Sequence, residues 1–270
     1  SRRAANPHLP RLMGALRQLG PSTAQAWGAA LGLSQPTVSR LLASAKAGVV
    51  RIGRARRTRY AAVRDVRGLG ARWPLFRIDV HGRPHAFGEL AALSGAGTHV
   101  SSDNAPDWFQ DEFADGLFPG VPWFLDDQRP QGFLGRLFAQ RWSRELGLSP
   151  DVLDWDDDAV LTALLLRGED SAGNFVLGER SLENALRPRL ADIDATEREA
   201  RYAEREEATL AGKPVGSSAA GEQPKFTAAI GDDDGSVRHV IVKFSEPAES
   251  SAAARRWADL LICEHLAGKA

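Results

Sequence analysis

Residues 33–41 read LSQPTVSRL, and this stretch decides how the first part of the chain folds. Ser34 is a good helix N-cap, and Pro36 suits an early helical position because its fixed φ angle is already helical. Val38 and Leu41 recur at helical spacing, which places them on one apolar stripe. The stretch therefore predicts a short helix with a buried stripe and a polar outer face.

Two more helices are predicted before this one. Apolar residues recur at intervals of three and four between residues 9 and 19, and Gly20-Pro21 stops that helix. Ser22 or Thr23 can cap a second helix, which ends at a three-residue turn, residues 32–34. Two short helices joined by a tight turn that contains glycine form the helix-turn-helix pattern.

The outer face of the predicted third helix carries small and polar side chains. Such groups can reach base edges and phosphates when a helix lies in the major groove of DNA. The same pattern is compatible with a structural or dimerisation module, so both interpretations stay open. The candidate DNA-contacting residues on this helix are Gln35, Thr37, Ser39, Arg40 and Ser44.

A basic hairpin is predicted directly after the three helices. Residues 48–53 read GVVRIG and residues 54–60 read RARRTRY, which indicates two strands joined by a basic tip. This pattern is typical of the wing of a winged helix, whose arginines suit backbone phosphates. Residues 33–41 also closely resemble the recognition helices of bacterial winged-helix regulators. The predicted phosphate contacts are Arg54, Arg56, Arg57 and Arg59.

The distribution of charge favours the DNA-binding interpretation. Residues 1–72 contain thirteen arginines and one lysine against a single acid, Asp65, whereas the remainder carries 20 basic and 34 acidic side chains. A basic head on an acidic body is typical of a nucleic-acid-binding module fused to another domain. We therefore expect double-stranded DNA as a partner.

Length and composition set the broad class. A chain of 270 residues is long enough for about two domains at ~150 residues each. It contains no apolar run of about 18 residues, which excludes a membrane-spanning helix, and no short apolar segment of a secretory signal. The lone Cys263 excludes an internal disulfide and a cysteine-based zinc site. We expect a cytoplasmic, globular protein without a membrane partner.

The middle of the chain shows alternating strands and helices. Residues 61–73 are interpreted as a linker because they lack periodicity. Strands are predicted over 74–80 and 84–93, and helices over 133–146, 156–167 and 195–211. His81, His85 and His99 are scattered without a carboxylate at ligand spacing, so they are expected on the surface or in loops, and no metal site is assigned.

A glycine-rich segment, residues 215–226, reads VGSSAAGEQPKF. Small residues allow a backbone to turn its N–H groups toward an anion, but Glu222 stands where a P-loop requires lysine. Strands predicted over 225–230 and 237–244 follow, the second carrying Lys243, and then a helix over 250–267. This is the order of a kinase N-lobe, although an unrelated hairpin with a solvated lysine remains an alternative.

Four segments resemble the HipA family of bacterial serine/threonine kinases, the toxins of type II toxin–antitoxin systems. Residues 218–225, SAAGEQPK, resemble the family's loop, which reads Ser, two small residues, Gly, any residue, Gln, any residue, Lys. Residues 123–132, 161–174 and 240–244 are similar to three further family segments. A helix-turn-helix fused in front resembles the YjjJ-like branch.

The resemblance implies roles for particular residues. Ser218 matches the loop serine that the family phosphorylates on itself, which ejects the loop and silences the kinase, and Ser217 is a second candidate. Lys243 matches the ATP-binding lysine, whose acidic partner is not clearly matched, with Asp259 the nearest candidate and Glu264 the next. The stretch that contacts ATP is matched by Ala220, Gly221, Glu222, Gln223, Pro224 and Lys225.

The resemblance stops before the kinase C-lobe, where the catalytic and metal-binding aspartates of a kinase lie. We therefore expect this chain to be part of a longer protein that uses ATP and Mg²⁺, to bind ATP weakly by itself and not to transfer phosphate, so no catalytic residue is assigned. The alternative is a DNA-binding transcriptional regulator whose body is a non-catalytic, kinase-derived sensor or dimerisation domain.

The predicted fold class is α+β, with a mixed β-sheet and helices after the head. We expect a winged helix-turn-helix over 1–72, a HipA-like N-terminal subdomain over 73–192 and a kinase N-lobe portion over 193–270. The expected partners of the whole protein are DNA, a protein substrate and either a small antitoxin or a second copy.

Overall fold

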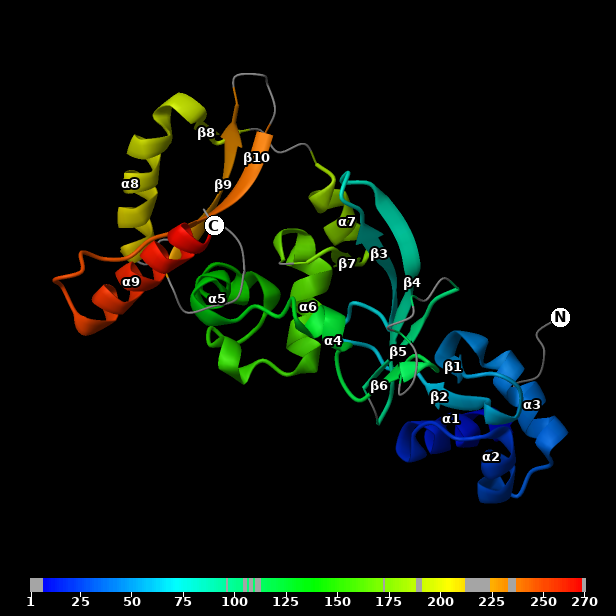
Figure 1. Ribbon diagram of the computed structural model, residues 1–270. Coiled ribbons are helices and arrows are strands. Elements are labelled where there is room, and N and C mark those ends of the chain that lie inside the picture. The colour runs from blue at the N-terminus through cyan, green and yellow to red at the C-terminus, as the bar shows by residue number, and fades with distance from the viewer. Residues whose placement is uncertain are drawn as a thin grey trace. The chain divides into compact units, whose positions relative to one another are not determined.

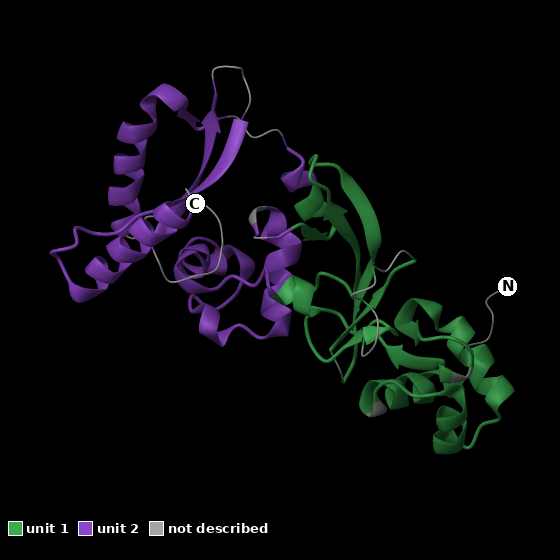
Figure 2. Cartoon of the chain, viewed as in Figure 1, with its two compact units in different colours: residues 1–126, 174–182 green, residues 127–173, 183–270 purple. Residues whose placement is uncertain are grey.

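The structure is a computed structural model that describes residues 7–95, 97–103, 106, 109, 113–171, 173–187, 191–211, 224–232 and 237–268. It is a mixed α and β structure with mainly antiparallel sheets. The chain forms two compact units, shown in Figure 2: Ser1–Asp126 with Asn174–Leu182, and Asp127–Gly173 with Glu183–Ala270. The predicted domain boundaries at residues 72 and 192 stay a prediction.

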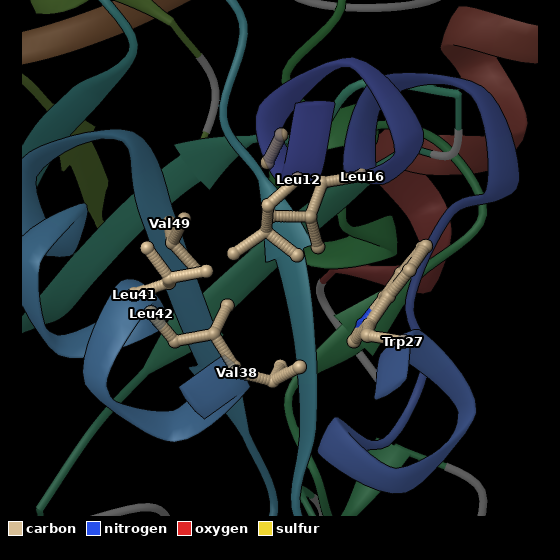
Figure 3. Close-up of a cluster of buried hydrophobic side chains, with 8 residues drawn as sticks. Leu12, Leu16, Trp27, Val38, Leu41, Leu42 and Val49 are labelled. Carbon is tan, nitrogen blue, oxygen red and sulfur yellow. The ribbon is translucent and has the colours of Figure 1, made fainter. Parts of the chain in front are cut away.

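The first unit begins with three helices and a hairpin, as the apolar periodicity predicts. These elements are α1 (His8–Leu19), α2 (Ala24–Leu31), α3 (Gln35–Ser44), β1 (Val49–Ile52) and β2 (Arg59–Ala62). Their shared core, drawn in Figure 3, consists of side chains from every one of these elements: Leu12, Leu16, Trp27, Val38, Leu41, Leu42, Val49 and Ala62. Burial of this stripe from each helix stabilises three helices that are too short to persist alone.

A backbone bridge completes this part of the first unit. Strands β1 and β2 are antiparallel, with Val50 opposite Ala61 and Ile52 opposite Arg59. Ser22, in the connection between α1 and α2, pairs with Tyr60 of β2 through N···O distances of 3.1 and 2.8 Å. The chain segment before α2 is therefore fixed beside the hairpin that follows α3.

Among its described residues, the first unit also contains a five-stranded antiparallel sheet with the order β6-β5-β4-β3-β7. Its strands are β3 (Arg72–Ile78), β4 (Pro84–Ala92), β5 (Thr98–Ser101), β6 (Leu117–Phe118) and β7 (Phe175–Leu177). The predicted hairpin of β3 and β4 is confirmed. The short helix α4 (Trp123–Asp126) follows β6, and α7 (Glu179–Ala185) follows β7.

The prediction of a linker over residues 61–73 is wrong. Ala61, Ala62 and Val66 are fully buried, and Val63 forms an antiparallel bridge with Leu93 at the end of β4. The physical reason is side-chain size. Two adjacent alanines carry little periodic signal, yet they let the backbones of the hairpin and the sheet approach closely.

The second unit contains a smaller sheet and several helices, as Figure 1 shows. Strands β9 (Lys225–Gly231) and β10 (Val237–Lys243) are antiparallel, and β8 (Ile193–Asp194) adds a parallel third strand beside β9. The sequence predicts the hairpin of β9 and β10. Its strands contribute to a buried apolar cluster that includes Phe226 and the following Phe244. The helices are α5 (Gly132–Leu146), α6 (Asp157–Arg167), α8 (Arg198–Leu210) and α9 (Ala252–Ala267).

Within the described part of the chain, every helix is too short or too polar to cross a membrane.

Candidate functional site

The polar residues predicted on α3 share one exposed face. Gln35, Ser39, Arg40 and Ser44 are exposed, and Thr37 is half-buried. The Oγ atom of Ser34 lies 2.9 Å from Oγ1 of Thr37, and the Arg40 guanidinium donates to the same Thr37 oxygen at 3.5 Å. These contacts fix side chains in the first turns of α3, whereas Gln35 and Ser39 are exposed on its surface.

The turn before α3 is built by backbone hydrogen bonds. The Thr23 side chain caps α2 by accepting from the Ala26 N–H at 3.2 Å. At the other end Gly32 has a φ angle of +67°, which favours glycine, and the Leu33 N–H donates to the Gly28 carbonyl at 2.9 Å. The two helices are therefore joined by a short turn in which the backbone N–H groups of Gly32 and Leu33 both donate to the Gly28 carbonyl.

The tip of the β1–β2 hairpin presents arginines, but not all of those predicted. Arg54 and Arg57 are exposed, and the side chain of Arg56 lies outside the described part. Arg59 is different, because its guanidinium forms an ion pair with the carboxylate of Asp115 and its side chain is only 35% exposed. Arg59 is thus engaged within the protein itself.

The β9–β10 hairpin places two lysines side by side. Lys243 stands opposite Lys225 in the antiparallel register, which directs both side chains to the same face of the sheet. Lys243 is partly exposed, whereas Lys225 is buried and Pro224 half-buried. The other predicted residues of the glycine-rich loop, Ser217, Ser218, Ala220, Gly221, Glu222 and Gln223, lie outside the described residues.

Glu264 of α9 is the acidic partner of Lys243. The Nζ atom of Lys243 lies 2.9 Å from both Oε1 and Oε2 of Glu264, so the contact is bidentate. Sequence reasoning ranked Asp259 ahead of Glu264. Helical spacing is the signal that could have found Glu264. Ala254 and Leu261 lie on the buried side of α9, and Glu264, three residues after Leu261, lies on the same side of the helix.

Of the three histidines expected on the surface or in loops, His81 and His85 are exposed, whereas His99 differs from the expectation. His99 is only 6% exposed, in strand β5, and burial lowers its pKa below the usual 6.5. His85 Nε2 lies 3.0 Å from the carboxylate of Asp79, and this contact together with bonds from Arg83 and His81 lowers the pKa of Asp79 to about 2. Among the described residues, no three acidic, histidine or cysteine side chains are placed to hold a metal ion.

Comparison with known proteins relates the chain to one group. Residues 69–186 match the family model of the YjjJ-like toxin, middle domain. The chain is 37% identical over 255 residues to Toxin YjjJ of Escherichia coli (strain K12), an alignment that covers 93% of this chain and 54% of that protein. The chain therefore spans about half the length of this curated relative. No solved structure matches. Both similarities support one conclusion, that this chain is related to the YjjJ-like toxins and that residues 69–186 correspond to their middle domain.

Proposed function

We propose that the chain binds double-stranded DNA, with α3 in the major groove and the β1–β2 hairpin as a wing against the phosphates. The observation that carries the proposal is the arrangement of α2, the bonded turn and α3 over one buried core, with the polar face of α3 exposed. The Ser22–Tyr60 bridge supports a winged helix, because this single antiparallel bridge sets the α1–α2 connection beside the hairpin. The cationic charge of residues 1–72 supplies the long-range attraction.

The test is a titration of the whole chain with duplex DNA at several salt concentrations. Arg57→Ala should weaken binding to all duplexes alike and reduce the salt slope by about 0.9, because it removes a phosphate contact. Gln35→Ala should reduce the preference among sequences with little change in the salt slope. The matched control is Arg198→Ala, which removes one exposed cation from α8. If the whole chain does not bind duplex DNA at low salt, the proposal is wrong.

We further propose that the whole protein is a HipA-type serine/threonine kinase toxin, to which this chain contributes the first part of a nucleotide site. The specific observation in favour is the bidentate Lys243–Glu264 pair, since kinases need a lysine–glutamate pair of this kind to hold ATP phosphates. Residues Ala220–Lys225 would contact ATP, Mg²⁺ would be bound outside the described residues, and Ser218 or Ser217 would be phosphorylated by the kinase itself. The relative named Toxin YjjJ gives the proposal its toxin class.

The kinase proposal is tested on a protein of the relative's full length. Lys243→Ala and Glu264→Ala should each abolish phosphate transfer and remove phosphate from Ser218 or Ser217, as measured by mass spectrometry. Asp259→Ala is the control, because Asp259 lies on the same helix away from Lys243, and it should leave transfer unchanged. Absence of phosphate transfer by the unmodified full-length protein would favour the regulator with a non-catalytic, kinase-derived domain.

A further inference from the structure

The β1–β2 hairpin is covered on both faces, although a wing usually has one face in solvent. One face carries Val49 and Ala62 and packs on the three helices. The other carries Val50, Ile52 and Ala61, which form a separate buried cluster. Because alternate residues of a strand point to opposite faces, the hairpin joins two cores. The second cluster also contains Ala91 of β4 and Leu93, the residue that directly follows β4.

Backbone hydrogen bonds continue the contact between the hairpin and the sheet. The Ser94 N–H donates to the Ala62 carbonyl at 2.8 Å, and the Arg64 N–H donates to the Ala92 carbonyl at 3.0 Å. These two backbone hydrogen bonds therefore connect the end of β2 to the end of β4. The hairpin belongs structurally to the middle sheet as much as to the helical head.

Two arginine side chains also connect the hairpin to other parts of the first unit. Arg59 lies opposite Ile52 in the β1–β2 register and so shares the face that packs on the sheet, where it pairs with Asp115. Arg72, on β3, donates to a Glu89 carboxylate oxygen at 2.7 Å and to the Val49 carbonyl at 2.8 Å. One guanidinium thus joins β1 to β4.

We propose that Arg59 and Arg72 are positioning residues for DNA binding: through Asp115 and Glu89 they hold the wing in its binding orientation and do not themselves contact phosphates. The inference rests on the proposed DNA-binding function. A guanidinium that already pairs with a carboxylate must lose that pair before it can bind a phosphate. Among the residues that the structure describes, no carboxylate pairs with the exposed Arg54 or Arg57 at the tip, so no ion pair there has to be broken before a phosphate binds.

Asp115→Asn is the decisive variant, because two explanations predict opposite signs. If the acid only repels DNA electrostatically, its removal strengthens duplex binding. If it positions the wing, its removal lowers the fraction of molecules with a binding-competent wing, and the apparent dissociation constant rises by the inverse of that fraction. We expect Asp115→Asn and Arg59→Ala each to weaken duplex binding by about fivefold, the upper range for an ion pair whose side chains are 35% and 33% exposed.

The salt slope separates positioning from direct contact. Arg59→Ala should leave the slope unchanged, since the bound state keeps all its phosphate contacts, whereas Arg57→Ala should lower the slope by about 0.9. The exchanged pair Arg59→Asp with Asp115→Arg should bind more tightly than either single variant at these positions, because it restores the ion pair while removing the cation at position 59, although it gives up the bond that Asp115 accepts from the Leu117 N–H at 3.2 Å. Thermal unfolding of each variant confirms that it is folded at the titration temperature.

Each outcome decides between specific alternatives. Tighter binding by Asp115→Asn, a lower salt slope in Arg59→Ala or a failed rescue by the exchanged pair would overturn the positioning role and leave DNA binding intact. Variants with lower unfolding temperatures and unchanged affinity would make the pair structural only. Failure of the parent chain to bind any duplex would overturn the DNA-binding function itself, together with the role that rests on it.

Discussion

A β-carbon added to Gly28 of α2 would lie 2.7 Å from the carbonyl oxygen of Leu33, in the turn that leads to α3. The same Leu33 donates its N–H to the Gly28 carbonyl. The closeness of the two helices in the head therefore depends on the absence of a side chain at position 28.

Gly28→Ala should destabilise the head by about 2 kcal/mol, because the obstacle is backbone and cannot rotate away. It should also weaken duplex binding, since α3 is displaced. The control is Gly14→Ala in α1, where no atom lies within 4 Å of the added carbon. That variant should be neutral or stabilised by about 0.5–1 kcal/mol. Equal unfolding temperatures for the two variants would contradict the prediction.

A fragment of residues 1–72 should be less stable than the same residues within the whole chain. The fragment lacks Ala91 and Leu93, and it exposes Val50, Ile52 and Ala61 to water. Burial of apolar area at about 25 cal/mol per Å² is lost on that face of the hairpin. Hydrogen exchange at the amides of β1 and β2 measures the difference. Equal protection in the fragment and the whole chain would show that the sheet does not support the hairpin.

The Lys243–Glu264 pair should matter little for stability. Both side chains are about half exposed, with 40% and 52% of their surface accessible, and such pairs contribute about 0–1 kcal/mol. Glu264→Ala should therefore unfold within about 1 kcal/mol of the parent chain in urea. Phe226→Ala, at a fully buried position, should cost about 3–5 kcal/mol. A large loss of stability in Glu264→Ala would mean that the pair is structural.

Stability should fall below neutral pH because of His99. Burial lowers the pKa of His99 in the folded state, whereas the unfolded chain titrates at its usual 6.5. The unfolded state then binds more protons as the pH drops through 6.5, so this stabilisation is complete above that pH and is lost progressively below it. Denaturation at pH 7.5 and 5.5 measures the effect. His99→Gln should show a smaller difference, and the exposed His81→Ala should match the parent chain.

The elements of the head could be predicted from the sequence because their signals are local. The caps Thr23 and Ser34 and the apolar stripes lie within a few residues of the helices that they define. The strands β9 and β10 and the helix α9 could be predicted for the same reason. Each needs only its own alternation or periodicity.

The supports of the candidate site could not be predicted, because they are long-range. In the sequence, Arg59 cannot be told from the other basic residues of the predicted wing, because its partner Asp115 lies 56 positions later. The burial of Ala61 depends likewise on Leu93, which directly follows β4 and lies 32 positions later in the chain. Lys243 and Glu264 are 21 positions apart, and their contact depends on the rotation of α9 about its axis.

The order in which the chain leaves the ribosome has a consequence for the five-stranded sheet. Strand β7 pairs with β3, yet residues 127–173 of the second unit separate β7 from the other strands. Until residue 177 has been synthesised, one edge of β3 has no partner. Unpaired edges of nascent sheets are sites where chains aggregate. Slow translation or premature termination within α5 or α6 should therefore yield insoluble nascent chains, whereas release after β7 gives a sheet with its own edge strand in place.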